Sequence, residues 1–122
     1  MVRVKPVDEQ EIELYFKQHN IEICDGAMAM VAIEGENTVG SAVFSLTEDK
    51  LTLLSVIYPE KDLFICDLTS RAVMNYGINR GKLYCELGEK APYKEFVLFG
   101  FIKSAEEKSV NIIKTFTMCT NC

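Results

Sequence analysis

The segment YPEKDLFICD, residues 58–67, lies where an α/β protein often holds an anion. It follows the apolar run LTLLSVI, which is typical of a buried strand, and it leads into a segment with the pattern of an amphipathic helix. Where a strand runs into a helix, the first backbone N–H groups and the helix dipole can hold a phosphate. Such turns are usually rich in glycine, but no glycine lies between Gly40 and Gly77.

Charge in the same turn opposes a phosphate. Glu60, Asp62 and Asp67 outnumber Lys61, whereas a helix dipole supplies only about half a positive charge at its N-terminus. A carboxylate about 6 Å from a phosphate costs roughly 3 kcal/mol at an effective dielectric constant of 20. A second interpretation therefore stays open, in which the turn is a helix start capped by Asp62.

A second candidate for chemistry is the cysteine pair Cys119-Thr-Asn-Cys122. This C-x-x-C spacing can supply half of a tetrahedral zinc site or a redox dithiol. The remaining zinc ligands would be Cys24 and His19, whose H-x4-C spacing is not that of a standard zinc knuckle. We expect no metal, and a redox or metal role for Cys119 and Cys122 stays open.

The sequence contains no visible Ser-His-Asp or Cys-His pairing. His19 is expected at the end of the first helix, where the helix dipole favours a positive charge. Ser55 is expected to be buried and bonded to the backbone. A general base is usually a carboxylate at a strand end, but LTLLSVIY, residues 51–58, contains no acid. The catalytic residues therefore remain unknown at this stage.

Length and charge limit the classes of protein. The 122 residues are sufficient for a single domain, 1–122, with one core. A net charge of −5, without a run of three basic residues, argues against nucleic acid. No apolar stretch is long enough to cross a membrane, and the N-terminus does not resemble a signal peptide. We expect a cytoplasmic protein with five reduced cysteines.

Hydrophobic periodicity and turn residues predict the elements that position these groups. Helices are expected from Asp8, with Glu11 completing a capping box, from 62 to 80, where Gly81 ends the helix, and from Pro92 to Gly100. The buried stripe of the 62–80 helix is expected at Ile65, Leu68, Ala72, Val73 and Tyr76. Strands are expected at 2–7, 28–34, 38–46, 51–58 and 82–87, followed by a hairpin of FIKS, 101–104, and VNIIKTFT, 110–117.

Three short segments in this order resemble the GCN5-related N-acetyltransferase (GNAT) family. Ile57-Tyr58-Pro59 is similar to the V-x-P that ends the fourth strand of the family. The segment LTSRAVMNYGINRG, 68–81, is similar to its long helix, which ends in Arg-Gly, and FVLFGF, 96–101, is similar to its Y-x-x-x-G-F.

The resemblance implies an α/β (α+β) fold, with a twisted, mixed and mostly antiparallel sheet of six to seven strands and about three helices. Strands four and five of the family run parallel and splay apart, and acetyl-CoA lies between them. The pantetheine of acetyl-CoA pairs with the fourth strand, and its pyrophosphate lies on the turn into the long helix. By this resemblance the cofactor-binding residues are Ile57, Lys61, Leu63, Phe64, Ile65, Cys66 and Asp67.

The family pattern is incomplete at these positions. Its turn, (Arg/Gln)-x-x-Gly-x-(Gly/Ala), falls on Lys61, Phe64 and Cys66, so both glycines are missing. The tyrosine that often protonates the leaving thiolate falls on Phe96. Tyr93, one helical turn earlier, is a candidate to replace it, but a packing role is the more common one for a tyrosine there. The Asn and Ala that often begin the same helix correspond to Glu89 and Pro92.

Two hypotheses for the function follow from the resemblance. The first is an acetyl-CoA-dependent N-acyltransferase with a degenerate pyrophosphate turn, acting on a small-molecule or peptide amine. The second is a non-catalytic binding or interaction module that has lost its CoA chemistry, because fold alone does not determine function. Relatives often pair through their C-terminal strands, so a homodimer is a further hypothesis.

Overall fold

The computed structural model of the chain describes residues 1–120, which form a six-stranded twisted sheet with the strand order β1-β2-β3-β4-β5-β6. The pair β4–β5 is parallel and the other neighbouring pairs are antiparallel, so the predicted mixed sheet is confirmed. The strands are β1 (Val2–Pro6), β2 (Ala27–Glu34), β3 (Asn37–Leu46), β4 (Leu51–Ile57), β5 (Tyr84–Leu87) and β6 (Ser109–Asn111).

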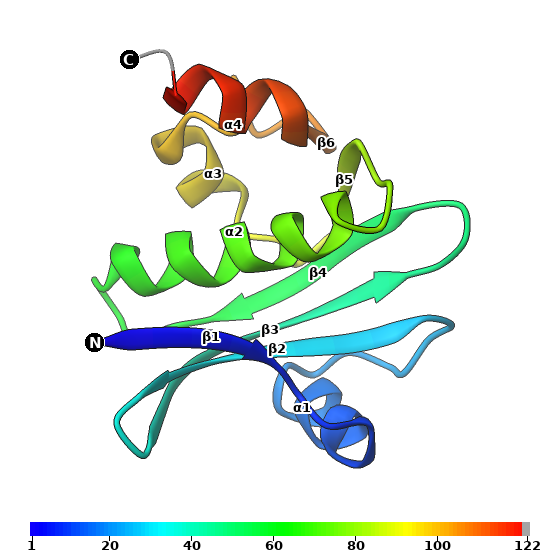
Figure 1. Ribbon diagram of the computed structural model, residues 1–122, viewed down its shortest axis with the longest axis vertical. Helices are drawn as coiled ribbons and strands as arrows, with labels where there is room; N and C mark the ends of the chain where they lie inside the picture. Colours follow the sequence, from blue (N-terminus) through cyan, green and yellow to red (C-terminus); the bar gives the residue numbers. More distant parts are fainter. Residues whose placement is uncertain (121–122) are drawn as a thin grey trace.

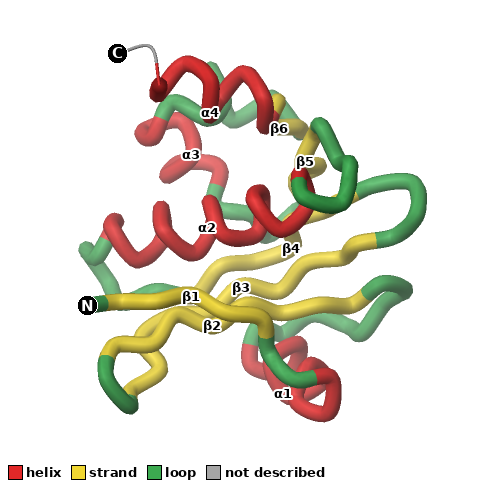
Figure 2. Tube along the Cα trace, viewed as in Figure 1, coloured by secondary structure: helices red, strands yellow, loops and turns green. Residues whose placement is uncertain are grey.

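Helices cover both faces of the sheet (Figures 1 and 2). A short 3-10 turn (Glu9–Glu11) leads into α1 (Ile12–Gln18), which lies on one face. On the other face lies α2 (Leu63–Ile78), with α3 (Tyr93–Phe99) and α4 (Ile112–Thr120) stacked beyond it. Each face of the sheet therefore has its own hydrophobic core.

Alternation along the strands divides the apolar residues between these cores. On β3, Val43 belongs to the smaller core under α1, and its neighbours Ala42 and Phe44 belong to the larger core under α2. The central strand β4 contributes Leu51 and Leu53 to the larger core, and both side chains are fully buried. Both faces of the strand LTLLSVI are apolar because helices cover the sheet on both sides.

The long helix α2 begins where the sequence indicates, after Asp62, but it ends at Ile78, two residues before the predicted end. The Ile65 N–H donates to Asp62 Oδ1 (3.3 Å), which makes Asp62 the N-cap, and Gly81 takes a φ of +85° after the last turn. The predicted stripe is rotated, because Leu68, Ala72 and Tyr76 are only half-buried. The buried face consists of Ile65, Cys66, Thr69, Ser70, Val73, Met74 and Gly77.

The predicted C-terminal hairpin is wrong. Residues 101–104 form bends rather than a strand, β6 spans only Ser109–Asn111, and the chain continues as α4. Asn111 Oδ1 accepts a hydrogen bond from the Lys114 N–H (3.0 Å) and so caps the first turn of this helix. Ile112 and Phe116, four residues apart, pack against the larger core, a helical spacing that the β-branched composition of the segment obscured.

The first helix also begins later than predicted. Asp8 makes no side-chain capping bond, and the expected capping box with Glu11 is absent because residues 9–11 form the 3-10 turn. The first α-helical residue is Ile12, which packs in the smaller core with Phe16.

A close helix–strand contact gives a test of the fold. A Cβ atom on Gly77 of α2 would lie 3.3 Å from Leu51 Cγ of β4 and closer still to a Leu51 methyl group. We predict that Gly77→Ala lowers the free energy of unfolding by about 1 kcal/mol in urea denaturation, because overpacking outweighs the gain of up to about 1 kcal/mol in helix propensity.

The matched control is the same substitution in a Leu51→Ala background. There the clash is absent, so Gly77→Ala should leave stability unchanged or raise it by up to about 1 kcal/mol. A stabilising effect in the wild-type background would show that α2 does not pack this closely on β4.

Candidate functional site

The parallel strands β4 and β5 separate part-way along their length. Their pairing runs from Leu51↔Cys85 to Leu53↔Leu87, and the Gly88 N–H then donates to the Leu53 carbonyl oxygen (2.9 Å). Beyond this point β4 continues to Ile57 without a pairing partner on that side among the described residues. We call the edge of β4 from Leu54 to Ile57, with the facing segment 88–95, the β4–β5 notch.

A β-bulge lies at the start of the notch. Val43 pairs with Ser55 and Phe44 pairs with Leu53, which leaves Leu54 as the extra residue on β4. Leu54 packs with the core under α1, whereas Val56 packs with the core under α2. The bulge therefore lets Ser55 point towards α1 instead of alternating to the other face.

His19, at the end of α1, lies directly over this bulge. Its Nδ1 is 2.9 Å from Ser55 Oγ on β4, and its Nε2 is 2.8 Å from Ser41 Oγ on β3. Only 5% of His19 is exposed. The prediction that the helix dipole explains His19 is wrong, as is the prediction that Ser55 bonds to the backbone, because the two side chains bond to each other.

Burial lowers the pKa of His19 from 6.5 to about 4, so the imidazole is neutral near pH 7. A neutral imidazole has one N–H and one lone pair. One serine hydroxyl therefore donates to the ring and the other accepts from it. This arrangement links α1 to β3 and β4 through a pair of buried hydrogen bonds.

The end of α1 also contacts the other side of the notch. The Lys90 ammonium donates to the Asn20 carbonyl oxygen (2.8 Å), and Lys90 lies in the segment between β5 and α3. Because His19 holds β4 and Asn20 holds this segment, the end of α1 spans the notch on its face of the sheet.

On the opposite face, Tyr58 closes the notch. Its hydroxyl, just after β4, donates to the Glu95 carboxylate of α3. Burial and the Glu95 carboxylate raise the pKa of Tyr58, and burial and Glu95 raise the pKa of the Cys66 thiol to about 12. The Tyr58 hydroxyl and the Cys66 thiol are therefore both protonated at neutral pH.

The first turn of α2 lies beside the same closure. The N–H groups of Leu63 and Phe64 have no partner among the described residues, whereas the Asp62 carboxylate accepts from the Ile65 N–H. Lys61 is exposed and takes a φ of +70°, a conformation that favours glycine. The Leu63 and Phe64 N–H groups are thus available to an anion. They lie next to the Asp62 carboxylate, which already accepts from the Ile65 N–H.

Comparisons with known proteins point to one fold. No family model matches the sequence, and no curated protein matches it. Among solved structures, the ribosomal-protein-S18-alanine N-acetyltransferase from Escherichia coli superposes with a TM-score of 0.58 at 8% identity, over 71% of this chain and 66% of that one. The chain has the GNAT fold.

Two further GNAT structures agree with this assignment. An acetyltransferase from Bacillus subtilis in complex with CoA gives a TM-score of 0.50 at 12% identity, over 71% of this chain and 64% of that one. The AtaT Y144F mutant toxin, bound to the C-terminus of the antitoxin AtaR, gives 0.59 at 13% identity, over 100% and 99% of the two chains. This chain thus spans just under two thirds of the length of the Escherichia coli and Bacillus subtilis enzymes.

Tyr93, the candidate to replace the family tyrosine, makes other contacts in the structure. The Tyr93 hydroxyl lies 2.9 Å from the carbonyl oxygens of both Leu87 and Gly88, so it is engaged at the end of β5. Phe96, at the position of the family tyrosine, is fully buried between Phe99 and Phe101. Neither residue offers a free hydroxyl to the notch.

The seven residues expected to bind the cofactor surround the end of β4 and the start of α2, but their side chains differ in role. Phe64 is 63% exposed, and Ile57 and Leu63 are also exposed. The side chains of Ile65 and Cys66 are buried, and their N–H groups already donate to Asp62. Asp67 forms an ion pair with Arg71 (2.8 Å), which offsets its charge in the turn.

Two further expectations concern a metal ion and the cysteines. Within the described part of the chain, no group of three or more His, Cys, Asp or Glu side chains is arranged to hold a metal ion. The side chain of Cys119 and all of Cys122 lie outside the described residues. Cys24 is exposed, and Cys66 and Cys85 are buried free thiols.

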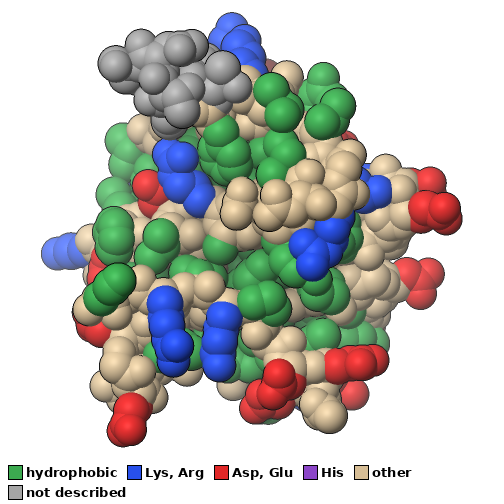
Figure 3. Space-filling view, viewed as in Figure 1, with side chains coloured by type: hydrophobic (Ala, Val, Ile, Leu, Met, Phe, Trp, Pro, Cys, Tyr) green, Lys and Arg blue, Asp and Glu red, His purple; other side chains and the backbone are tan. Residues whose placement is uncertain are grey.

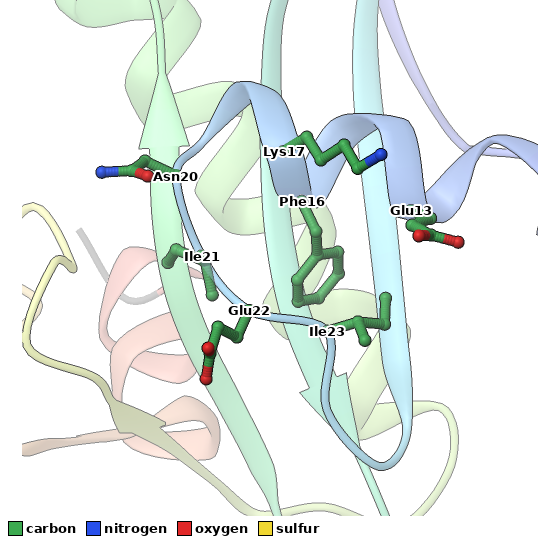
Figure 4. Close-up of a pocket in the computed structure, with 7 residues that line it drawn as sticks. All are labelled: Glu13, Phe16, Lys17, Asn20, Ile21, Glu22 and Ile23. Carbon is green, nitrogen blue, oxygen red and sulfur yellow. The ribbon is translucent and has the colours of Figure 1, made fainter.

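A cavity of about 480 Å³ lies beside the end of α1, between this helix and the loop that follows it. In Figure 4 the Phe16 ring points towards the strands and the Asn20 side chain points away from the other labelled residues. Because Asn20 also binds Lys90, the cavity lies next to the α1 side of the notch. Its charged residues are Glu13, Lys17 and Glu22.

Among the residues that the structure describes, no helix is both long and apolar enough to cross a bilayer. In Figure 3 hydrophobic side chains gather over the middle of the visible face, and acidic side chains lie mostly towards its edges.

His19 gives a pH test of this site. The unfolded chain binds a proton on His19 below pH 6.5, whereas the folded chain does so only near pH 4. His19 therefore leaves stability unaffected above about pH 6.5 and lowers it as the pH falls from 6.5 to 4, by about 3 kcal/mol in total.

We predict that the free energy of unfolding of the wild type falls by about this amount more than that of His19→Gln between pH 7 and pH 4, measured by urea denaturation. Carboxylates titrate in both proteins, so the difference isolates His19. Parallel pH profiles for the two proteins would mean that His19 is not held neutral in the fold.

Proposed function

We propose that this chain is a GNAT-type N-acyltransferase that takes the acyl group of acetyl-CoA and transfers it to a small-molecule or peptide amine. The observation that supports the proposal is the separation of β4 from β5 after Leu53 and Leu87. It leaves a strand edge free in the middle of a sheet, where paired backbone would otherwise be expected. An extended ligand with amide groups fits such an edge by adding to it as a strand would.

The residues of the notch fit the two parts of acetyl-CoA differently. The edge from Leu54 to Ile57 offers backbone donors and acceptors to the amides of the pantetheine arm. The start of α2 fits the pyrophosphate poorly, because the Asp62 carboxylate occupies the Ile65 N–H. We therefore infer that the arm contributes most of the affinity and that the pyrophosphate lies towards Leu63, Phe64 and solvent.

Tyr58 and Glu95 are the pair at the notch that can move protons in this reaction. When bound, acetyl-CoA would supply a thioester that an amine could attack, with a C–N bond formed and the C–S bond broken. In the proposal, Tyr58 gives its proton to the leaving thiolate and Glu95 takes the proton that the amine loses. Transfer of that proton from Glu95 to Tyr58, along their hydrogen bond, restores both groups.

A second candidate function is a non-catalytic binding module. The Tyr58–Glu95 hydrogen bond favours it, because this bond closes one side of the notch in the free protein. Phe96 favours it as well, since it has no proton to donate. A module of this kind keeps the fold and binds its partner without breaking a thioester.

A thermal-shift titration with acetyl-CoA separates the two functions. At about 100 times its dissociation constant, the cofactor should stabilise the fold by roughly 2.7 kcal/mol, which is several degrees for a domain of this size. The matched controls are dephospho-CoA and pantethine. No shift at millimolar acetyl-CoA would contradict the N-acyltransferase, whereas a shift without thiol release in the presence of a panel of amines would support the module.

The poor fit of the pyrophosphate at the start of α2 leads to a prediction about the affinity for acetyl-CoA. Asp62→Asn keeps a good helix cap and removes one negative charge beside the pyrophosphate. We expect acetyl-CoA to bind about tenfold more tightly to this variant, because the roughly 3 kcal/mol of repulsion at a dielectric constant of 20 is reduced by solvent and salt.

The control for this variant is Asp49→Asn, which makes the same charge change in the exposed turn before β4. It should change the affinity less than twofold. Equal effects of the two substitutions, or weaker binding by Asp62→Asn, would show that the pyrophosphate does not lie at the start of α2.

A further inference from the structure

A second cavity, of about 410 Å³, lies between α2, the end of α3 and the start of α4. We call it the α3–α4 cavity. It is well away in sequence from the turn at 58–67, and it exists because residues 112–120 form a helix rather than the second strand of a hairpin. Its size lies in the range of pockets for small organic ligands.

The floor of this cavity is aromatic. Phe99 and Phe101 line it, and their rings pack at a centroid distance of 5.4 Å. The Arg71 guanidinium lies over the Phe101 ring, 5.0 Å from its centroid, and is paired with Asp67. Because Phe101 is only 6% exposed and Arg71 lies over its ring, the half-buried Phe99 supplies the accessible apolar surface, next to a fixed cation.

The rim of the cavity is positively charged. Lys103 and Lys114 line it with a single carboxylate, Glu107, whereas the charge of Arg71 is offset by its ion pair with Asp67. Among the described residues the only ion pair is the one between Arg71 and Asp67, so the two lysines are not neutralised there. Glu107 accepts a hydrogen bond from the Lys103 backbone N–H (3.0 Å), which holds the Glu107 carboxylate close to the backbone of Lys103.

This charge stands out in a protein with a net charge of −5. An acidic protein repels anions in general. A cavity lined by more cations than carboxylates nevertheless attracts an anion locally. The aromatic floor selects for an apolar body, because burying apolar area stabilises a complex whereas a bare anion gains nothing from it.

We propose that the α3–α4 cavity binds a small organic carboxylate with an aromatic or branched apolar body. The carboxylate meets Lys103 and Lys114, and the apolar body lies against Phe99. This site is separate from the β4–β5 notch and does not depend on acetyl-CoA. It would let a metabolite that carries no amine bind to the same domain.

Amide chemical-shift mapping with 3-phenylpropionate tests the proposal on the full chain. We expect saturable shifts for Gly100, Lys103, Ser109 and Lys114, with a dissociation constant on the order of 1 mM, as is usual for so small a ligand. The uncharged analogue 3-phenylpropan-1-ol should bind at least fivefold more weakly. No saturable shifts up to 10 mM, or equal binding of the alcohol, would overturn the proposal.

Charge reversal at the rim supplies the matched variants. Lys103→Glu and Lys114→Glu change exposed side chains, so the fold should persist, and each should weaken 3-phenylpropionate binding at least fivefold. Lys50→Glu makes the same charge change in the turn before β4 and should alter the affinity less than twofold. Shifts that map to the β4–β5 notch, or equal loss in all three variants, would also overturn the proposal.

Discussion

The early end of the pairing between β4 and β5 is the constraint on which the rest of the structure depends. Three residue pairs join the two strands, and one further hydrogen bond, from the Gly88 N–H to the Leu53 carbonyl, ends the ladder. A strand edge opened inside a sheet leaves backbone groups that need partners. On one face the end of α1 contacts both sides of the opening, and on the other face Tyr58 is hydrogen-bonded to Glu95 of α3.

The two closures of the notch differ in chemistry. On the α1 face, His19 is neutral and bonded to two serines, which makes a rigid structural link. On the α2 face, Tyr58 and Glu95 form a hydrogen bond between groups that can exchange a proton. A ligand that enters the notch would therefore rearrange the Tyr58–Glu95 closure. The His19 closure keeps α1 fixed on β3 and β4.

Local signals in the sequence were sufficient for much of the fold. The cap at Asp62, the left-handed Gly81 and the short polar turns between β2, β3 and β4 each act within a few residues, and all were predicted. The order of strands up to β5 followed from them. The last segment was not predicted, because the β-branched residues of 110–117 suit a strand and the packing of Ile112 and Phe116 against the core decides otherwise.

The site depended on contacts that no local pattern reveals. His19 meets Ser55 across 36 residues, and it does so only because a bulge at Leu54 turns Ser55 to that face. Glu95 meets Tyr58 across 37 residues. A lone histidine three residues after Phe16, on the apolar face of a short helix, was the one available signal that its side chain is buried.

The most direct test of the account is hydrogen exchange at the free edge of β4. With saturating acetyl-CoA, the amides of residues 54–57 should exchange more slowly, because a bound pantetheine arm would pair with this edge. Amides of β2, which lies two strands away, should not change. Unchanged exchange at 54–57 in the presence of saturating cofactor would contradict the claim that the β4–β5 notch is the binding site.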